Sequence, residues 1–166
     1  AKQLTNTMVM MRVERGQLGI HTRVADVVPA FGQKGKHNVT IGDLMIHKAG
    51  LPLGLPPMPP ELIGDIDAMT DVACGLLPEG VPGTRVNYSA LIAHSVLASI
   101  LRRLDGGRRS YREMLADELL EPLGMSETSL GARADLESRC VPIVARDRSP
   151  DMFDPDLLEG LAALLT

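Results

Sequence analysis

The sequence contains very few aromatic residues. Among its 166 residues there are two Tyr, two Phe and no Trp. Large rings usually supply much of the buried area in protein cores, so aliphatic residues and the nine methionines are the expected core filler here. A tyrosine in such a chain stands out, and Tyr88 lies where a proline- and glycine-rich stretch gives way to an amphipathic pattern. We therefore treat Tyr88 as a candidate functional residue.

Cysteine, long apolar runs and a strong excess of one charge are also lacking. Cys74 and Cys140 are too few for a disulfide framework and lack metal-ligand spacing, so two reduced thiols are favoured, with one bridge as the alternative. No apolar run approaches the roughly 20 residues of a membrane helix. No signal-peptide pattern opens the chain, which favours a soluble, cytoplasmic protein. The net charge of −4 is spread over mixed signs and gives no reason to expect a nucleic acid or an anionic membrane as partner.

What is present is a chain of helices with clear start and stop signals. With 45% hydrophobic and 23% charged residues, the chain suits one globular domain or a large piece of one. Thr40 is a candidate N-cap, Gly16 a candidate C-cap, and Ser110 with Glu113 forms a predicted capping box. Apolar periodicity predicts helices at residues 2–15, 40–50, from Tyr88 to about 104, and 110–121.

The remaining segments have weaker signals, and strands are scarce. Residues 51–65 carry too many prolines for regular structure and are predicted to form a stiff, extended loop. The acidic stretch 64–71 lacks the ligands of a calcium loop and is interpreted as a helix start or a loop. Residues 133–139 and 154–166 are each compatible with a helix, and 140–146 is the one convincing strand. The predicted class is mainly α.

Several of these segments resemble one enzyme family. "GTRVNYSALIAHSVL" followed by "EPLGM" is similar to the P-G-T, Y-S-N and E-P-L-G-M succession of serine β-lactamase-like hydrolases. "NVTIGDLMIHKAGLP" at residues 38–52 is similar to the family's I-T-I-R-H-L-L-T-H-T-S-G-L-P, and residues 12–32 are similar to its stretch that follows the nucleophile helix. The family includes class C β-lactamases, DD-peptidases, esterases and acyltransferases.

The resemblance implies a fold as well as an activity. These enzymes share a helical domain packed on an antiparallel sheet, so the chain is expected to be the helical part of the α/β β-lactamase-like (DD-peptidase) fold, with most of the sheet missing. Residues 1–131 form the helical portion, and residues 132–166 continue the same domain without an assignment. No K-T-G or H-x-G motif, the family's third, follows residue 131. An apolar face left without its sheet is expected to self-associate.

The resemblance also implies two catalytic residues. Lys2 matches the lysine of the family's S-x-x-K motif, whose serine, three residues earlier, falls outside the chain. A serine hydroxyl is a weak nucleophile and needs a neighbouring base. Tyr88 matches the tyrosine of Y-S-N, and the helix that follows it, together with the Lys2 charge, favours a phenolate that acts as that base. The 166 residues alone are expected to be inactive because the serine is absent.

Two further positions depart from the family pattern. Gly54 stands where class C β-lactamases have a glutamine that touches the substrate amide, and Ala90 replaces the asparagine of Y-S-N. Both are candidate substrate-binding positions, and their lack of polar side chains favours an ester or amide hydrolase, or acyltransferase, over a β-lactamase. No cofactor or metal is expected. The histidines (His21, His37, His47 and His94) have no metal-binding spacing and are interpreted as surface or packing residues.

Two hypotheses from different classes remain open. In the first, the chain is part of an active serine hydrolase of small ester, amide or β-lactam substrates. In the second, it is a catalytically inactive relative that binds a ligand or a protein through the same cleft. Without the family motifs, Lys2 would be interpreted as a solvated chain end and Tyr88 as a packing residue with a hydrogen-bonded hydroxyl.

Overall fold

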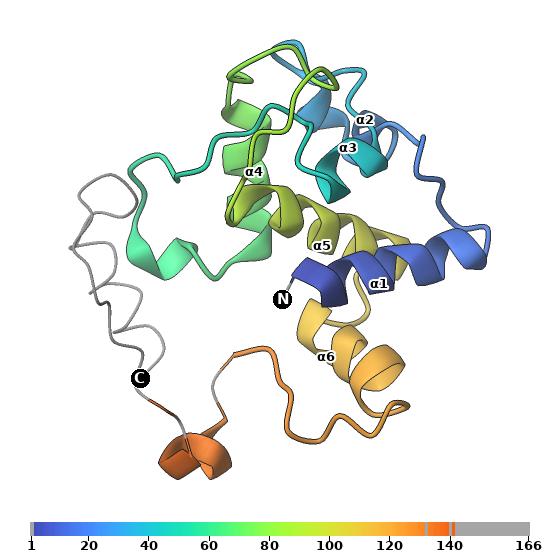
Figure 1. Ribbon diagram of the computed structural model, residues 1–166, viewed down its shortest axis with the longest axis vertical. Coiled ribbons are helices and arrows are strands. Elements are labelled where there is room, and N and C mark those ends of the chain that lie inside the picture. Colours follow the sequence, from blue (N-terminus) through green and yellow to red (C-terminus); the bar gives the residue numbers. More distant parts are fainter. Residues whose placement is uncertain (1, 132, 140, 142–166) are drawn as a thin grey trace.

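The computed structural model describes residues 2–131, 133–139 and 141, and in this part of the chain it is helical (Figure 1). The elements are α1 (Lys2–Glu14), α2 (Val24–Val27), η1 (Pro29–Gly32), α3 (Ile41–Met45), η2 (Pro60–Leu62), α4 (Ile66–Gly75), α5 (Ile92–Leu104), α6 (Tyr111–Leu115), η3 (Ala116–Leu120) and η4 (Ala134–Arg139). Within these ranges no strand occurs, and one isolated antiparallel bridge joins Arg23 and Thr40. The mainly α prediction is confirmed for the described residues. The strand predicted at 140–146 and the helix at 154–166 lie, apart from Val141, outside them.

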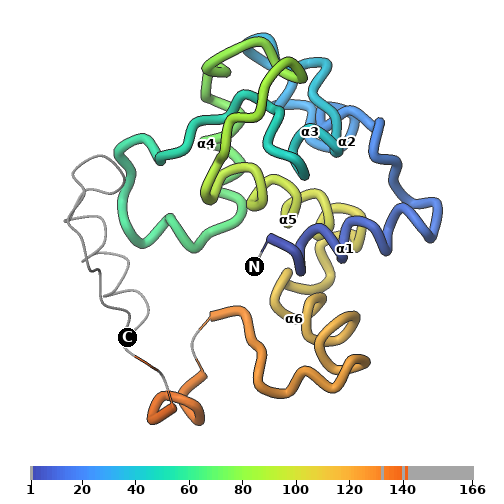
Figure 2. The backbone as a smooth tube through the Cα atoms, in the orientation of Figure 1, coloured from blue at the N-terminus to red at the C-terminus, as the bar shows by residue number. Residues whose placement is uncertain are grey.

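Helix α5 is the centre of the molecule. It contacts α1, α3, α4 and α6, and Figure 2 shows its trace running among these helices. Of the apolar face that the periodicity predicted, Val96, Leu97, Ile100 and Leu101 are fully buried and Leu104 is partly buried. Ile92 is fully buried as well. Burying aliphatic side chains of this size contributes about 1.5–3 kcal/mol each. The core therefore consists mainly of α5 aliphatics and surrounding methionines, with Phe31 and Tyr111 as its buried rings.

The predicted caps are confirmed, but two helices are shorter than predicted, since α3 ends at Met45 and α5 begins at Ile92. Gly16 has a φ of 67°, and the amides of Gly16 and Gln17 bond the carbonyls of Val13 and Arg12, which closes α1. At α3 the Thr40 hydroxyl accepts from the Asp43 amide while the Asp43 carboxylate accepts from the Thr40 amide. The same reciprocal pair of bonds joins Ser110 and Glu113 at α6. Each such cap is worth about 1 kcal/mol.

Helix α4 is longer than the sequence suggested. Asp65 caps it by accepting from the amides of Asp67 (2.8 Å) and Ala68 (3.0 Å), so the predicted helix start at 64–71 is a full helix. Its carboxyl end receives the fully buried ammonium of Lys36, which donates to the carbonyls of Cys74 and Leu76. A cation is favourable at that end of a helix, although burial lowers the pKa of Lys36. Cys74 itself is a buried free thiol.

Helix α1 is tied to the α6 region by polar contacts, which matters because α1 carries Lys2. The hydroxyls of Thr5 and Tyr111 hydrogen-bond at 2.8 Å in the interior. Two helical turns further along α1, Arg12 donates to both oxygens of Glu118 at 2.6 and 2.8 Å.

Every helix among the described residues is too short or too polar to span a membrane.

Candidate active site

The structure brings Lys2 and Tyr88 together from distant parts of the chain. The Lys2 ammonium donates to the carbonyl of Ala90 at 2.7 Å and lies 5.0 Å from the centroid of the Tyr88 ring. An ammonium at this distance from an aromatic ring is attracted to its face. Tyr88 is about half exposed, at 49%. A lysine and a phenol thus share one solvent-accessible place at the start of α1.

Backbone hydrogen bonds hold the Tyr88 segment against two loops. The Asn87 amide donates to the carbonyl of His47 at 2.7 Å, and the Asn87 side chain donates to the carbonyl of Leu51 at 2.9 Å. The Ser89 hydroxyl accepts from the Ala93 amide, which supports the first turn of α5. With both of its chain neighbours bonded, the segment is fixed on either side of Tyr88.

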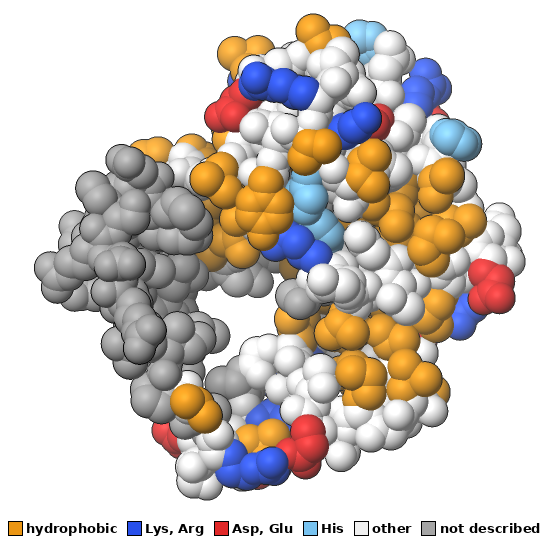
Figure 3. Space-filling model, viewed as in Figure 1, with side chains coloured by type: hydrophobic (Ala, Val, Ile, Leu, Met, Phe, Trp, Pro, Cys, Tyr) orange, Lys and Arg blue, Asp and Glu red, His pale blue; other side chains and the backbone are white. Residues whose placement is uncertain are grey.

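Gly54 and Ala90 lie near the Lys2–Tyr88 pair. The Ala90 amide approaches the carbonyl of Leu53 at 3.4 Å, which places Gly54 next to the Lys2 contact. A Cβ atom added at Gly54 would meet nothing within 4 Å. Neither residue offers a polar side chain, and Leu53 and Leu91 are exposed beside them. In Figure 3, orange hydrophobic side chains lie around pale-blue histidine atoms and blue Lys or Arg atoms near the middle of the face shown.

The sequence analysis missed two histidines that belong to this site. The His47 ring lies 4.8 Å from the Tyr88 ring and 5.2 Å from the His94 ring, measured between centroids. Burial, and then the Lys2 charge, lower the pKa of His47. Burial, His47 and Lys2 lower the pKa of His94 to about 4. Both imidazoles are therefore neutral at pH 7.

Only folding reveals this grouping, because the two histidines are 47 positions apart in the chain and neither follows a ligand spacing. The one sequence signal is that His94 comes six residues after Tyr88, in the first turn of the helix that this tyrosine precedes. Within the described ranges, no cluster of three or more His, Cys, Asp or Glu side chains is placed to hold a metal ion. The chemistry available is proton transfer between an ammonium and a phenol beside neutral imidazoles.

Comparison with known proteins points in one direction. The family model described as Beta-lactamase matches residues 1–163. Penicillin-binding protein 4 of Amycolatopsis lactamdurans is 33% identical over 135 residues, which cover 77% of this chain and 34% of that protein. Esterase/beta-lactamase LipL of Mycobacterium tuberculosis is 30% identical over 144 residues, or 86% of this chain and 33% of that protein.

A solved structure agrees with these relatives. The crystal structure of a family VIII carboxylesterase superposes with a TM-score of 0.74 at 27% identity, over 83% of this chain and 38% of that one. The chain spans about a third of the length of the two curated relatives.

Proposed function

Because this chain belongs to the beta-lactamase family, we propose that it is part of a serine hydrolase that cleaves small ester or amide substrates, or transfers their acyl group, through an acyl-enzyme. Lys2 and Tyr88 activate a serine that lies outside these 166 residues. The observation that carries the proposal is the meeting of the Lys2 ammonium, the Tyr88 ring and the Ala90 carbonyl at the start of α1. The relatives, a penicillin-binding protein and an esterase/beta-lactamase, support the substrate class.

The proposed chemistry assigns one proton to the pair. As the serine oxygen attacks the carbonyl carbon, its proton passes to the phenolate oxygen of Tyr88, whose ring lies beside the Lys2 ammonium. The proton then goes to the leaving alkoxide or amine when the tetrahedral adduct collapses to the acyl-enzyme. Water, or an acceptor alcohol, then attacks the acyl-enzyme and gives its proton to Tyr88, which passes the proton to the departing serine oxygen. This step releases the acid or the new ester.

Esters fit the proposed substrate edge better than β-lactams do. A site that recognises an amide needs polar partners for it, because a buried unpaired amide costs about 1–3 kcal/mol. Gly54 and Ala90 supply no such side chains, and the exposed residues beside them, Leu53 and Leu91, are apolar.

The test compares the two tyrosines of the chain in the intact protein that contains it. Tyr88→Phe is expected to keep the fold and lower kcat/KM for p-nitrophenyl acetate by roughly two to four orders of magnitude, the usual worth of a positioned base. Lys2→Ala is expected to cause a comparable loss that does not add fully to the first, because both groups act on one proton. Tyr111→Phe is the matched control, since its hydroxyl bonds Thr5 in the interior. It is expected to cost about 1 kcal/mol of stability and leave the rate unchanged.

Full activity of folded Tyr88→Phe would make Tyr88 a packing residue and overturn the proposal. Ligand binding without any turnover by the unaltered intact protein would instead support the catalytically inactive relative.

A further inference from the structure

Three aromatic rings contact one another in succession, and Lys2 lies beside the third. His94, in the first turn of α5, contacts His47, and His47 contacts Tyr88. The planes of the His47 and Tyr88 rings are inclined by 55°, so the imidazole lies tilted against the phenol. The Lys2 ammonium lies 5.0 Å from the Tyr88 ring centroid. The phenol thus has both an imidazole and an ammonium as neighbours.

The backbone at His47 has a left-handed conformation. Its φ is 59°, in the left-handed region that residues other than glycine rarely adopt. Hydrogen bonds fix it: the His47 amide donates to the carbonyl of Leu44 at 3.3 Å, and its carbonyl accepts from the Asn87 amide at 2.7 Å. With the bond from the Lys48 amide to the Asp43 carbonyl at 2.7 Å, this is the usual left-handed cap that ends a helix, here α3, and it fixes the backbone from which the His47 ring extends.

The ring has a second contact with the Tyr88 segment. His47 Nδ1 accepts the amide proton of Ser89 at 3.3 Å. A histidine nitrogen accepts a hydrogen bond only when it carries no proton. The contact therefore exists for the neutral ring with its proton on Nε2 and is lost when the imidazole becomes charged.

We propose that neutral His47 is a positioning residue for Tyr88, which holds the phenol beside Lys2 by accepting from the Ser89 amide and packing against the ring. This inference rests on the proposed roles of Tyr88 and Lys2. His47 does not touch the substrate; it acts through the residue next to it in space.

The groups that face His47 make its charge state consequential. They are Lys2 from α1, His94 from α5, and Tyr88 from the loop that precedes α5. Burial, and then the charge of Lys2, lower the pKa of His47. A proton on Nδ1 would also remove the Ser89 contact. Activity is therefore expected to fall as the pH drops below that pKa, and to be complete above it.

The activity test uses two variants that both suit a left-handed backbone. In His47→Asn the side-chain oxygen takes the place of Nδ1, and asparagine tolerates positive φ; in His47→Gly the backbone is relaxed and the acceptor is gone. In the intact protein, His47→Gly is expected to lower kcat by about 10- to 100-fold, the effect of a misplaced catalytic group, with little change in KM. His47→Asn is expected to recover most of kcat and to lose the part of the acid limb due to His47. His37→Asn, at an exposed histidine, is the control and should match the unaltered protein.

A second measurement needs no activity. In nitrogen-15 NMR spectra of the intact protein, the Ser89 amide is expected to shift with the His47 imidazole titration and to stop titrating in His47→Asn. Nuclear Overhauser contacts between Lys2 and the Tyr88 ring are expected to persist in His47→Asn and to weaken in His47→Gly. If the intact protein proves inactive, the proposed function fails while these spectra still decide the placement. A Ser89 amide that ignores His47, or unchanged kcat in His47→Gly, would overturn the positioning role.

Discussion

At the scale of single residues, burial separates two side chains of the same type. Tyr111 is 6% exposed and bonds Thr5, and burial raises the pKa of its phenol. Tyr88 is 49% exposed and faces Lys2 and His47. A buried phenol with a hydroxyl partner contributes packing and one hydrogen bond. An exposed phenol beside an ammonium is free to exchange a proton with a substrate, which is why the proposed base is Tyr88.

The first prediction concerns substrate choice at Ala90 and Gly54. Ala90→Asn and Gly54→Gln are expected to raise the ratio of nitrocefin to p-nitrophenyl acetate turnover, in kcat/KM, because each adds an amide partner worth about 0.5–1.5 kcal/mol, or up to about tenfold. Gly54 has room for the side chain, since an added Cβ meets nothing within 4 Å. Gly64→Gln, at another open and exposed glycine of the same loop, is the control. An unchanged ratio in both test variants would show that neither position selects the substrate.

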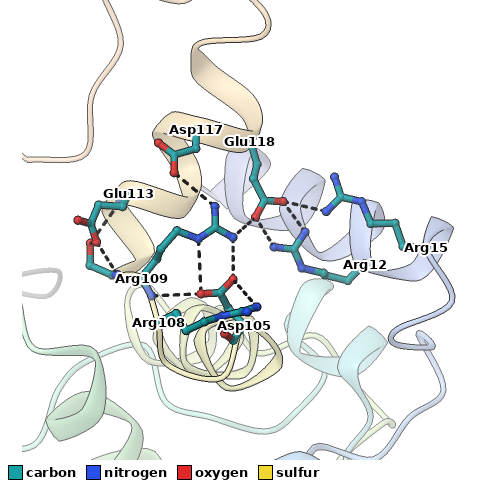
Figure 4. A network of polar contacts seen from close by, with 9 residues as sticks. Arg12, Arg15, Asp105, Arg108, Arg109, Glu113, Asp117 and Glu118 are labelled. Carbon is teal, nitrogen blue, oxygen red and sulfur yellow. Dashed lines mark hydrogen bonds and ion pairs between the residues drawn. The ribbon is translucent and has the colours of Figure 1, made fainter.

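At the scale of elements, one carboxylate holds three segments together. Glu118, in the π-helix η3 after α6, bonds Arg12 of α1, Arg15 just after the end of α1, and Arg109, which precedes α6 (Figure 4). The Arg12 contact uses both carboxylate oxygens, and the Arg12 side chain is 4% exposed. Bidentate, charge-assisted bonds of this kind are the stronger ones. They fix the orientation of the helix that carries Lys2.

The second prediction follows from that carboxylate. Glu118→Gln is expected to lower the free energy of unfolding by about 3 kcal/mol, because it leaves the buried Arg12 charge without its partner. Arg12 is the main reason that the pKa of Glu118 falls from 4.5 to about 2. Since the folded-state pKa is the lower one, this stability is present above about pH 4.5 and is lost as the pH falls toward 2.

Urea unfolding of the unaltered protein and the variant at pH 7 and at pH 2.5 checks both statements. The difference between them should shrink at the lower pH. Asp117→Asn removes one half-exposed ion pair with Arg109 and should cost under about 1 kcal/mol. Equal effects of the two variants would mean that burial of Arg12 does not matter.

At the scale of the whole molecule, much apolar surface remains uncovered. Large hydrophobic side chains that are exposed include Met10, Ile20, Ile46, Leu53, Leu62, Leu77, Val81, Val86, Leu91, Leu123, Leu130 and Val141. Isolated exposed apolar residues are ordinary, but extended patches mark surfaces that other protein covers. The aligned segments make up only about a third of each relative.

The third prediction concerns the 166 residues on their own. They are expected to self-associate at micromolar concentration, because association covers apolar surface, and to turn over neither p-nitrophenyl acetate nor nitrocefin, because the proposed serine is absent. Sedimentation velocity across a concentration series and a spectrophotometric assay measure the two properties. A strictly monomeric, cooperatively folded chain would contradict the first. Turnover that Tyr88→Phe abolishes would show that another residue is the nucleophile.

Features that depend on near neighbours were predictable from the sequence. A cap such as Thr40 with Asp43, or Ser110 with Glu113, joins residues three apart, so the letters alone indicate it. The burial of α5 follows from a repeat of 3.6 residues. Lys2, Tyr88, Gly54 and Ala90 were named from motifs that resemble a family. The structure brings Lys2 to Tyr88 and Ala90, and Ala90 to the Leu53 carbonyl next to Gly54.

The tertiary structure alone decided the features built from distant residues. The sequence does not show that Lys36 bonds the carboxyl end of α4, or that the His47 ring contacts both Tyr88 and His94. Each of these contacts joins segments about 40 residues apart or more. Periodicity and caps report on a single helix, where hydrogen bonds are local. The pKa of His94, the bonds of Glu118 and the tilt of the His47 ring depend on which helices pack together. Packing is set by the burial of side chains over the whole chain at once, and no local stretch of letters contains that sum.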